Sequence, residues 1–197
     1  YEASEKYMDY LNYHTDESNR FTSSHDGPWV EEYRKFEETH TNPDRLVASL
    51  FKDKYFILKK VNPKELMWGM YWVASDMQNA ETKVSFYDLF KGQELFDLWQ
   101  CVNYRFYVGN ANHADGKGIV VANAKSLLRN ILDSADEAIR KGGIAATLRF
   151  GHDGNVIPLV ALMQIENCNV AVSDPYEVYK VWSDFKVVPM AANVQII

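Results

Sequence analysis

Apolar residues recur every three or four positions between residues 28 and 106, the spacing that places them on one face of an α-helix. Trp29, Tyr33 and Phe36, for example, fall at i, i+4 and i+7. Two Asn-Pro pairs and a serine stand where helices of this region begin, as caps and first-turn prolines do. The pattern predicts an all-helical region joined by short turns, with helices over 28–36, 43–51, 63–74, 87–90 and 93–106.

The stretch 109–118 is rich in Gly and Asn and has no apolar periodicity, so it is predicted to be a loop. A long amphipathic helix is predicted over 124–139, with Leu127 and Ile131 on its inner stripe. Lys141 and two glycines follow it, and glycine readily adopts the left-handed conformation that ends a helix.

The pattern changes after residue 143. Residues 144–150 form a short apolar run that is typical of a strand. Asn155 is the expected N-cap of a helix over 156–163, whose Pro158 lies in the first turn. Two further strands are predicted near the end of the sequence, over 187–190 and 193–197. Because helix, turn, strand, polar loop and helix follow one another, we predict an α/β fold class, α+β overall.

The composition excludes several classes of protein. Of 197 residues, 47% are apolar and 24% are charged. These are the values of an ordinary globular chain, and they exclude a disordered or fibrous one. The net charge of 21 − 27 = −6 argues against a general nucleic-acid binder, which needs a basic surface, although local basic pockets for small anions stay open. No apolar run approaches the roughly 18 residues of a membrane span, so none is expected.

Cys101 and Cys168 are too few for a disulfide scaffold or a zinc site, and no metal is expected. They fit either one disulfide in an oxidising compartment or two buried thiols. The sequence begins at Tyr1 without an initiator Met and ends within a predicted strand. From this we expect a processed product or a piece of a longer protein.

Residues 150–155 (FGHDGN) fall between a predicted strand and a predicted helix, where α/β proteins place ligand sites. The start of a helix attracts anions, and a His beside an Asp can hold an anion and deliver a proton to a leaving group. In the other interpretation, His152 and Asp153 lie in a polar loop and only cap the helix. The dipeptide alone does not separate the two, since His25-Asp26 has no strand before it.

Residues 148–159 (LRFGHDGNVIPL) resemble the second signature of the histidine acid phosphatases, the family that includes phytases and multiple inositol polyphosphate phosphatases. In that family a strand ends in a His that contacts the phosphoryl group, and an acidic proton donor follows. The resemblance extends over about residues 87–197, through segments that follow one another in the family's order: 88–99, 103–107, the helix of Leu127 and Leu128, and 188–194.

The resemblance implies a helical cap domain (α-domain) over 1–117 and part of a phosphatase α/β core over 118–197. It implies an enzyme that hydrolyses phosphate monoesters through a phosphohistidine, without a cofactor. Its partner is then a small-molecule phosphate ester, with no nucleic acid and no membrane span. Members of the family are mostly secreted or periplasmic, so the same location is expected here.

Four residues receive roles from the resemblance. His152 is expected to contact the phosphate and Asp153 to protonate the leaving alcohol, with Gly154 and Asn155 beside the substrate. Gly154 stands where inositol polyphosphate phosphatases carry a Glu, and where the His-Asp-Thr form has Thr. The substrate therefore stays open between phytate, a sugar phosphate and another monoester.

The family's nucleophile is absent from this sequence. It is a His in an Arg-His-Gly-x-Arg-x-Pro motif, and none of the five histidines (14, 25, 40, 113 and 152) has that context. Phosphoryl transfer through a covalent intermediate needs the nucleophile, and the arginines stabilise the phosphoryl charge. We therefore expect half of an active site here, inactive alone and completed by the part of its parent that carries the motif.

Two hypotheses from other classes stay open. A non-catalytic helical module with the phosphatase fold would bind phosphate or inositol phosphates without turnover, and a structural or interaction domain would bind no anion at all. Weaker candidates for binding have a solvated or core interpretation as well. They are His113 and Asp115 in the predicted loop, a basic cluster of Lys52, Lys54, Lys59 and Lys60, and a Trp68–Trp72 pair one helical turn apart.

Overall fold

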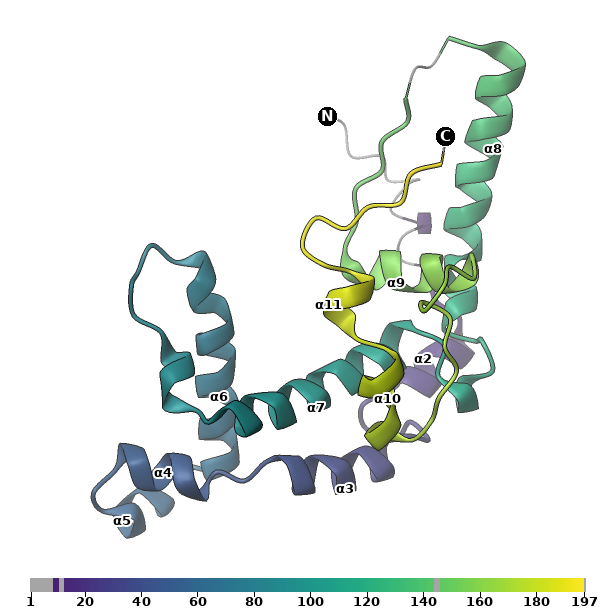
Figure 1. The fold of residues 1–197 in the computed structure, drawn as a ribbon. Coiled ribbons are helices and arrows are strands. Elements are labelled where there is room, and N and C mark those ends of the chain that lie inside the picture. The colour runs from purple at the N-terminus through teal and green to yellow at the C-terminus, as the bar shows by residue number, and fades with distance from the viewer. Residues whose placement is uncertain (1–8, 11–12, 144–145, 197) are drawn as a thin grey trace. The chain divides into compact units, whose positions relative to one another are not determined.

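The computed structural model describes residues 9–10, 13–143 and 146–196, and the regular secondary structure in those ranges is helical (Figure 1). The α-helices are α2 (Asp16–Thr22), α3 (Val30–His40), α4 (Asp44–Leu50), α5 (Lys54–Leu58), α6 (Pro63–Asp76), α7 (Gly92–Asn110), α8 (Lys125–Lys141), α9 (Asp153–Leu162), α10 (Pro175–Val181) and α11 (Asp184–Val187). Short 3-10 helices lie between them: η1 (Met77–Asn79), η2 (Phe86–Leu89), η3 (Ala114–Gly116) and η4 (Val121–Ala124).

The predicted α/β (α+β) fold class is wrong, because the described part of the chain contains no strand and is all-α. Residues 146–150, the described part of the predicted strand over 144–150, have no regular secondary structure. Leu148 and Phe150 are 76% and 69% exposed. A strand needs neighbouring strands for its hydrogen bonds, and an apolar run alone does not supply them.

The other two predicted strands, over 187–190 and 193–197, are also wrong where they are described. The amides of Val187 and Val188 donate to the carbonyls of Ser183 and Asp184, so local helical bonds use the backbone groups of this run. A turn follows, in which Ala192 N–H donates to the carbonyl of Pro189. Residues 193–196 have no regular secondary structure, and residue 197 lies outside the described residues.

The chain divides into two compact units. Unit 1 consists of residues 1–30 and 103–197, and unit 2 of residues 31–102. Helices α3 and α7 each run through a boundary between the units. The predicted division at residue 117 concerns a cap and a phosphatase core, and these packing units do not test it.

In unit 1, α8 and α9 pack with η4 around a core of Ala124, Leu127 and Leu159. The helix predicted over 124–139 is confirmed as α8, and it ends at Gly142, whose φ of 66° is in the left-handed region. The predicted loop 109–118 begins inside the last turn of α7 and contains η3.

In unit 2, α6 packs against α4 and η2. Asn62 caps α6, since its side-chain oxygen accepts a hydrogen bond from Lys64 N–H at 3.0 Å, and Pro63 follows in the first turn. The helix predicted over 63–74 is confirmed and extends to Asp76. The core consists of six buried residues: Leu46, Met67, Tyr71, Ala74, Phe90 and Leu98.

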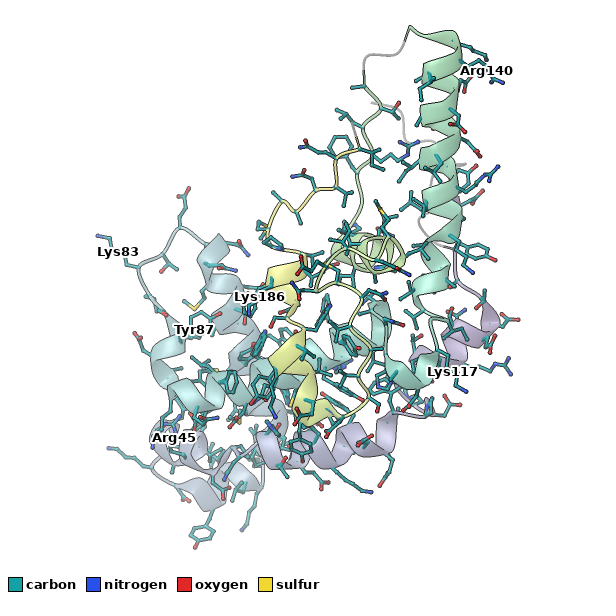
Figure 2. The ribbon with its side chains drawn as sticks, turned by 45° about the vertical axis from the view of Figure 1, so that its right-hand side comes forward. Arg45, Lys83, Tyr87, Lys117, Arg140 and Lys186 are labelled. Carbon is teal, nitrogen blue, oxygen red and sulfur yellow. The ribbon has the colours of Figure 1, made fainter. Side chains whose placement is uncertain are left out.

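A forked ion pair ties three elements of unit 2 together. Arg45 of α4, labelled in Figure 2, donates from Nε and Nη2 to the two carboxylate oxygens of Glu94 at 2.5 and 2.6 Å. Its Nη2 also donates to the carbonyl of Leu89 at 2.8 Å. Burial raises the pKa of Glu94, but hydrogen bonds from Arg45 and from the Lys91 amide, with the nearby positive charges, bring the pKa below its ordinary value.

We predict that Glu94→Gln lowers the free energy of unfolding by about 1–3 kcal/mol, because it leaves the Arg45 guanidinium without its charged acceptor. Urea denaturation followed by circular dichroism measures the change. The ordinary pKa of Glu94 is 4.5 and its folded pKa is lower, so the carboxylate stabilises the fold above about pH 4.5. The difference from wild type therefore shrinks as the pH falls below that value.

Glu137→Gln, at the exposed ion pair with Lys141, is the control, and it leaves the denaturation midpoint unchanged. Equal losses of stability in the Glu94 and Glu137 variants would contradict the prediction.

Candidate functional site

The predicted site residues lie on the first turn of α9, in unit 1. His152 is the N-cap of this helix, with an extended backbone (φ −112°, ψ 172°). The side-chain oxygen of Asn155 accepts a hydrogen bond from His152 N–H at 2.9 Å. Asn155 therefore reaches back from the third helical position, whereas the sequence predicted it as the cap of a helix that begins at residue 156. The helix begins at Asp153 instead.

Gly151 makes room for this cap. A Cβ atom at residue 151 would lie 2.9 Å from Asn155 Oδ1, closer than side-chain carbons normally approach an oxygen. Glycine thus allows the Asn155 side chain to fold back over the start of the helix.

Asp153 occupies the end of its own helix. Its Oδ1 accepts a hydrogen bond from Gly154 N–H at 2.8 Å, and the Asn155 amide donates to the carbonyl of His152. A carboxylate at a helix N-terminus is stabilised by the helix dipole, as a bound anion would be. The carboxylate of Asp153 therefore satisfies one of the backbone N–H groups at the start of α9.

The four predicted residues follow one another at the start of α9 and differ in solvent exposure. His152 and Asp153 are exposed, while Gly154 and Asn155 are half-buried and lead into the buried turn from Ile157 to Ala161. An imidazole and a carboxylate that are both accessible at one helix end can contact an anion and exchange a proton with it.

A small pocket lies beside this turn and has a volume of about 20 Å³. It is lined by Gly154 and Asn155 together with ten residues from the N-terminal segment, the end of α7, the η4 region and the starts of α8 and α9: Tyr10, Tyr13, His14, Gly109, Asn110, Val120, Asn123, Ala124, Leu127 and Pro158. This volume holds about one water molecule. A phosphate ester at His152 and Asp153 would therefore lie outside the pocket, on the exposed side of the turn.

Asn123 and His14 belong to this pocket and were not predicted as site residues. Asn123 Nδ2 lies 3.1 Å from His14 Nδ1, and Asn123 Oδ1 is buried with no hydrogen-bond partner among the described residues. A Cβ atom at residue 154 would lie 3.2 Å from Asn110 Oδ1, so Gly154 also lets Asn110 approach the turn. Since His14 and Asn123 are far apart in sequence, no local pattern predicts their contact.

His113, a candidate ligand in a predicted loop, is buried instead. The side chain is 2% exposed and lies among the rings of Phe21, Tyr104 and Tyr107. Its Nδ1 accepts a hydrogen bond from Asp115 N–H at 3.3 Å, and its Nε2 lies 3.2 Å from Tyr104 Oη. Burial lowers the pKa of His113, and the Asp115 charge and the Ser173 backbone oppose that shift.

Tyr107 extends this buried cluster to the segment that follows α9. Its hydroxyl donates to the carbonyl of Val170 at 2.6 Å and accepts from Val172 N–H at 2.9 Å. Burial raises the pKa of Tyr107 to about 12, opposed by the Val172 hydrogen bond. The hydroxyl therefore stays protonated and holds this segment in place.

The remaining candidates lie in unit 2, except Cys168, which lies in unit 1. Lys52, Lys59 and Lys60 are exposed around α5, and Trp68 and Trp72 stack with ring centroids 6.1 Å apart. Trp68 packs partly against the core and Trp72 is 47% exposed. Cys101 is buried and Cys168 is half-buried, and the two do not form a disulfide in the structure.

No family model matches the chain, and a search of curated proteins finds no significant match. Neither comparison bears on the resemblance of about residues 87–197 to the histidine acid phosphatases, which stays a prediction from the sequence. None of the helices in the described part of the chain combines the length and apolarity needed to cross a membrane. The described residues also contain no group of three or more His, Cys, Asp or Glu side chains with the arrangement of a metal site.

We predict that protonation of His113 destabilises unit 1 at acidic pH. The folded pKa of His113 is lower than its ordinary value of 6.5, so the unfolded chain binds the proton more tightly. The contribution of the neutral ring is complete above pH 6.5 and decreases as the pH falls below it. The free energy of unfolding then loses up to about 1.4 kcal/mol per pH unit for this one proton.

The measurement is urea denaturation between pH 5 and 8 (roughly the range in which histidine titrates). His113→Gln keeps an acceptor for Asp115 N–H and removes the titration, so its stability depends less on pH than that of the wild type. His25→Ala, at an exposed loop residue, keeps the wild-type slope. Equal slopes in wild type and His113→Gln would show that His113 does not cause the effect.

Proposed function

We propose that this chain is a portion of a histidine acid phosphatase-like enzyme that hydrolyses phosphate monoesters through a phosphohistidine. In this proposal the start of α9 carries the phosphate contact His152 and the proton donor Asp153. The observation that supports it is that both side chains are exposed at the cap and first position of a helix whose next turn is buried. We expect the parent protein to be secreted or periplasmic.

The proposed chemistry follows from these two positions. A ring N–H of His152 donates a hydrogen bond to a phosphoryl oxygen, and the positive end of the α9 dipole adds to the attraction. Asp153, in its protonated form, gives its proton to the ester oxygen as the P–O bond breaks, so the alcohol leaves neutral. The phosphoryl group passes to the His of an Arg-His-Gly-x-Arg-x-Pro motif, which this sequence does not contain.

A binding module that lacks turnover is the second candidate. It is favoured by the absence of that motif from the 197 residues, since the site at α9 then holds an anion but has no nucleophile. The two candidates agree that the isolated chain binds phosphate at α9. They differ in what happens when the chain is joined to the nucleophile.

We predict that the purified chain binds inorganic phosphate and inositol hexakisphosphate without hydrolysing them. In calorimetric titrations, His152→Ala weakens binding about tenfold, the effect of one lost charge-assisted hydrogen bond. Asp153→Asn strengthens binding several-fold, because the carboxylate that caps Gly154 N–H no longer repels the anion. His25→Ala, in the other His-Asp pair, leaves the affinity unchanged. Loss of affinity in both His variants, or no binding at all, would contradict the site at α9.

In a longer chain that contains both this sequence and the nucleophile motif, Asp153→Asn distinguishes an enzyme from a binding module. A proton donor matters most for a poor leaving group, so the rate of phosphoenzyme formation falls far more with an alkyl phosphate than with nitrophenyl phosphate. Rapid-quench kinetics on both substrates measures the difference. Equal losses on the two substrates would argue against the donor role, and no turnover in the unmodified longer chain would favour the binding module.

A further inference from the structure

Helix α5 belongs to unit 2 and follows α4 and precedes α6 along the chain (Figure 1), and several apolar side chains in and just after it are exposed. Tyr55, Phe56, Leu58 and Val61 are 72%, 58%, 49% and 36% exposed. Ile57 of the same helix is half-buried. We call these four exposed apolar residues, together with the exposed lysines of the same segment (Lys52, Lys59 and Lys60), the α5 surface.

The α5 surface is basic in an acidic chain. The segment 52–61 contains four lysines and one aspartate, a net charge of 4 − 1 = +3, whereas the whole chain carries −6. Lys52, Lys59 and Lys60 are exposed, and none of them takes part in the ion pairs found within the described residues. The one aspartate, Asp53, caps α5 by accepting a hydrogen bond from Phe56 N–H at 3.0 Å.

The combination of exposed aromatic and aliphatic side chains with flanking lysines determines the kind of partner. A phosphorylated small molecule would use the lysines and leave the apolar side chains in water. The surface of an anionic bilayer uses both, because rings and aliphatic chains enter the headgroup boundary while lysine ammonium groups stay among the phosphates.

A groove on another protein fits less well. Helices that bind in such grooves present apolar anchors at i, i+4 and i+7, which requires at least two turns. Helix α5 has five residues, and its apolar exposure continues into the turn at Val61. We propose that the α5 surface binds peripherally to a bilayer that contains anionic phospholipids. This binding involves unit 2 alone and does not depend on the proposed phosphatase chemistry at α9.

The test is sedimentation of the full chain with vesicles of phosphatidylcholine, with and without about one-third phosphatidylserine. The expected result is a partition coefficient at least about tenfold higher on the anionic vesicles, which decreases as salt is added. Phe56→Ser weakens binding about tenfold by removing one apolar side chain from the interface. Lys60→Glu weakens binding by about the same factor through a charge reversal.

The controls lie elsewhere in unit 2 and change the same chemistry. Lys83, labelled in Figure 2, is exposed, and Val84 is 58% exposed. Lys83→Glu makes the same charge reversal as Lys60→Glu, and Val84→Ser replaces an exposed apolar side chain by serine as Phe56→Ser does. Both control variants are expected to bind the vesicles as the wild type does. Circular dichroism confirms that each variant is folded.

Three results would overturn the proposal. The first is no binding to anionic vesicles, and the second is equal binding to neutral ones. The third is an equal loss of binding in the Lys60 and Lys83 variants, which would show that the vesicles attract positive charge anywhere on the chain and not the α5 surface in particular. Binding of an acidic peptide in place of vesicles, with loss in Phe56→Ser, would assign the surface to a protein partner and would also contradict the proposal.

Discussion

The candidate site depends on the way α9 begins. Every α-helix starts with backbone N–H groups that have no partner in the helix, and here two of its own side chains accept hydrogen bonds at this end. Asn155 fixes the cap at His152, and Asp153 accepts from Gly154 N–H. These bonds fix the backbone at the start of the helix, where His152 and Asp153 are both exposed and the turn from Ile157 is buried. In the proposed site, a phosphate at this helix end would compete with the carboxylate of Asp153 for the N–H of Gly154.

Sequence patterns predicted the elements that are determined locally. The sequence contains the Asn62 cap and first-turn Pro63 of one helix, and the apolar stripe and terminating glycine of another, so α6 and α8 were predicted to within a few residues. The predicted strands were wrong, because a strand is stabilised by neighbouring strands and the pattern of one segment does not show whether such neighbours exist. Residues 146–150 instead meet α8: Arg149 donates to Asn130 Oδ1 and to Ser134 Oγ. The burial of His113 was not predicted for a related reason. It depends on packing against Phe21, Tyr104 and Tyr107, and the sequence of the loop does not contain that information.

The resemblance to the histidine acid phosphatases and the helical structure concern different properties of the chain. The resemblance concerns the order of residues around His152, and it predicts roles for four side chains on one turn. The structure concerns how these residues pack: the four lie together at the start of α9, and the described part of the chain has none of the sheet that the family implies. The pocket beside the turn has room for about one water, so substrate selection is not expected from within it. In the proposed enzyme, recognition of the ester then depends on groups outside the described turn.

The central claim is that the first turn of α9 binds phosphate through His152, with Asp153 as the competing anion. The most direct measurement is the shift of backbone amide signals in nuclear magnetic resonance spectra while inorganic phosphate is added to the labelled chain. The account predicts that the amide signals of residues 152–155 move together and saturate, while those of residues 25–27, around the other His-Asp pair, stay in place. Saturating shifts elsewhere with none at residues 152–155 would contradict it.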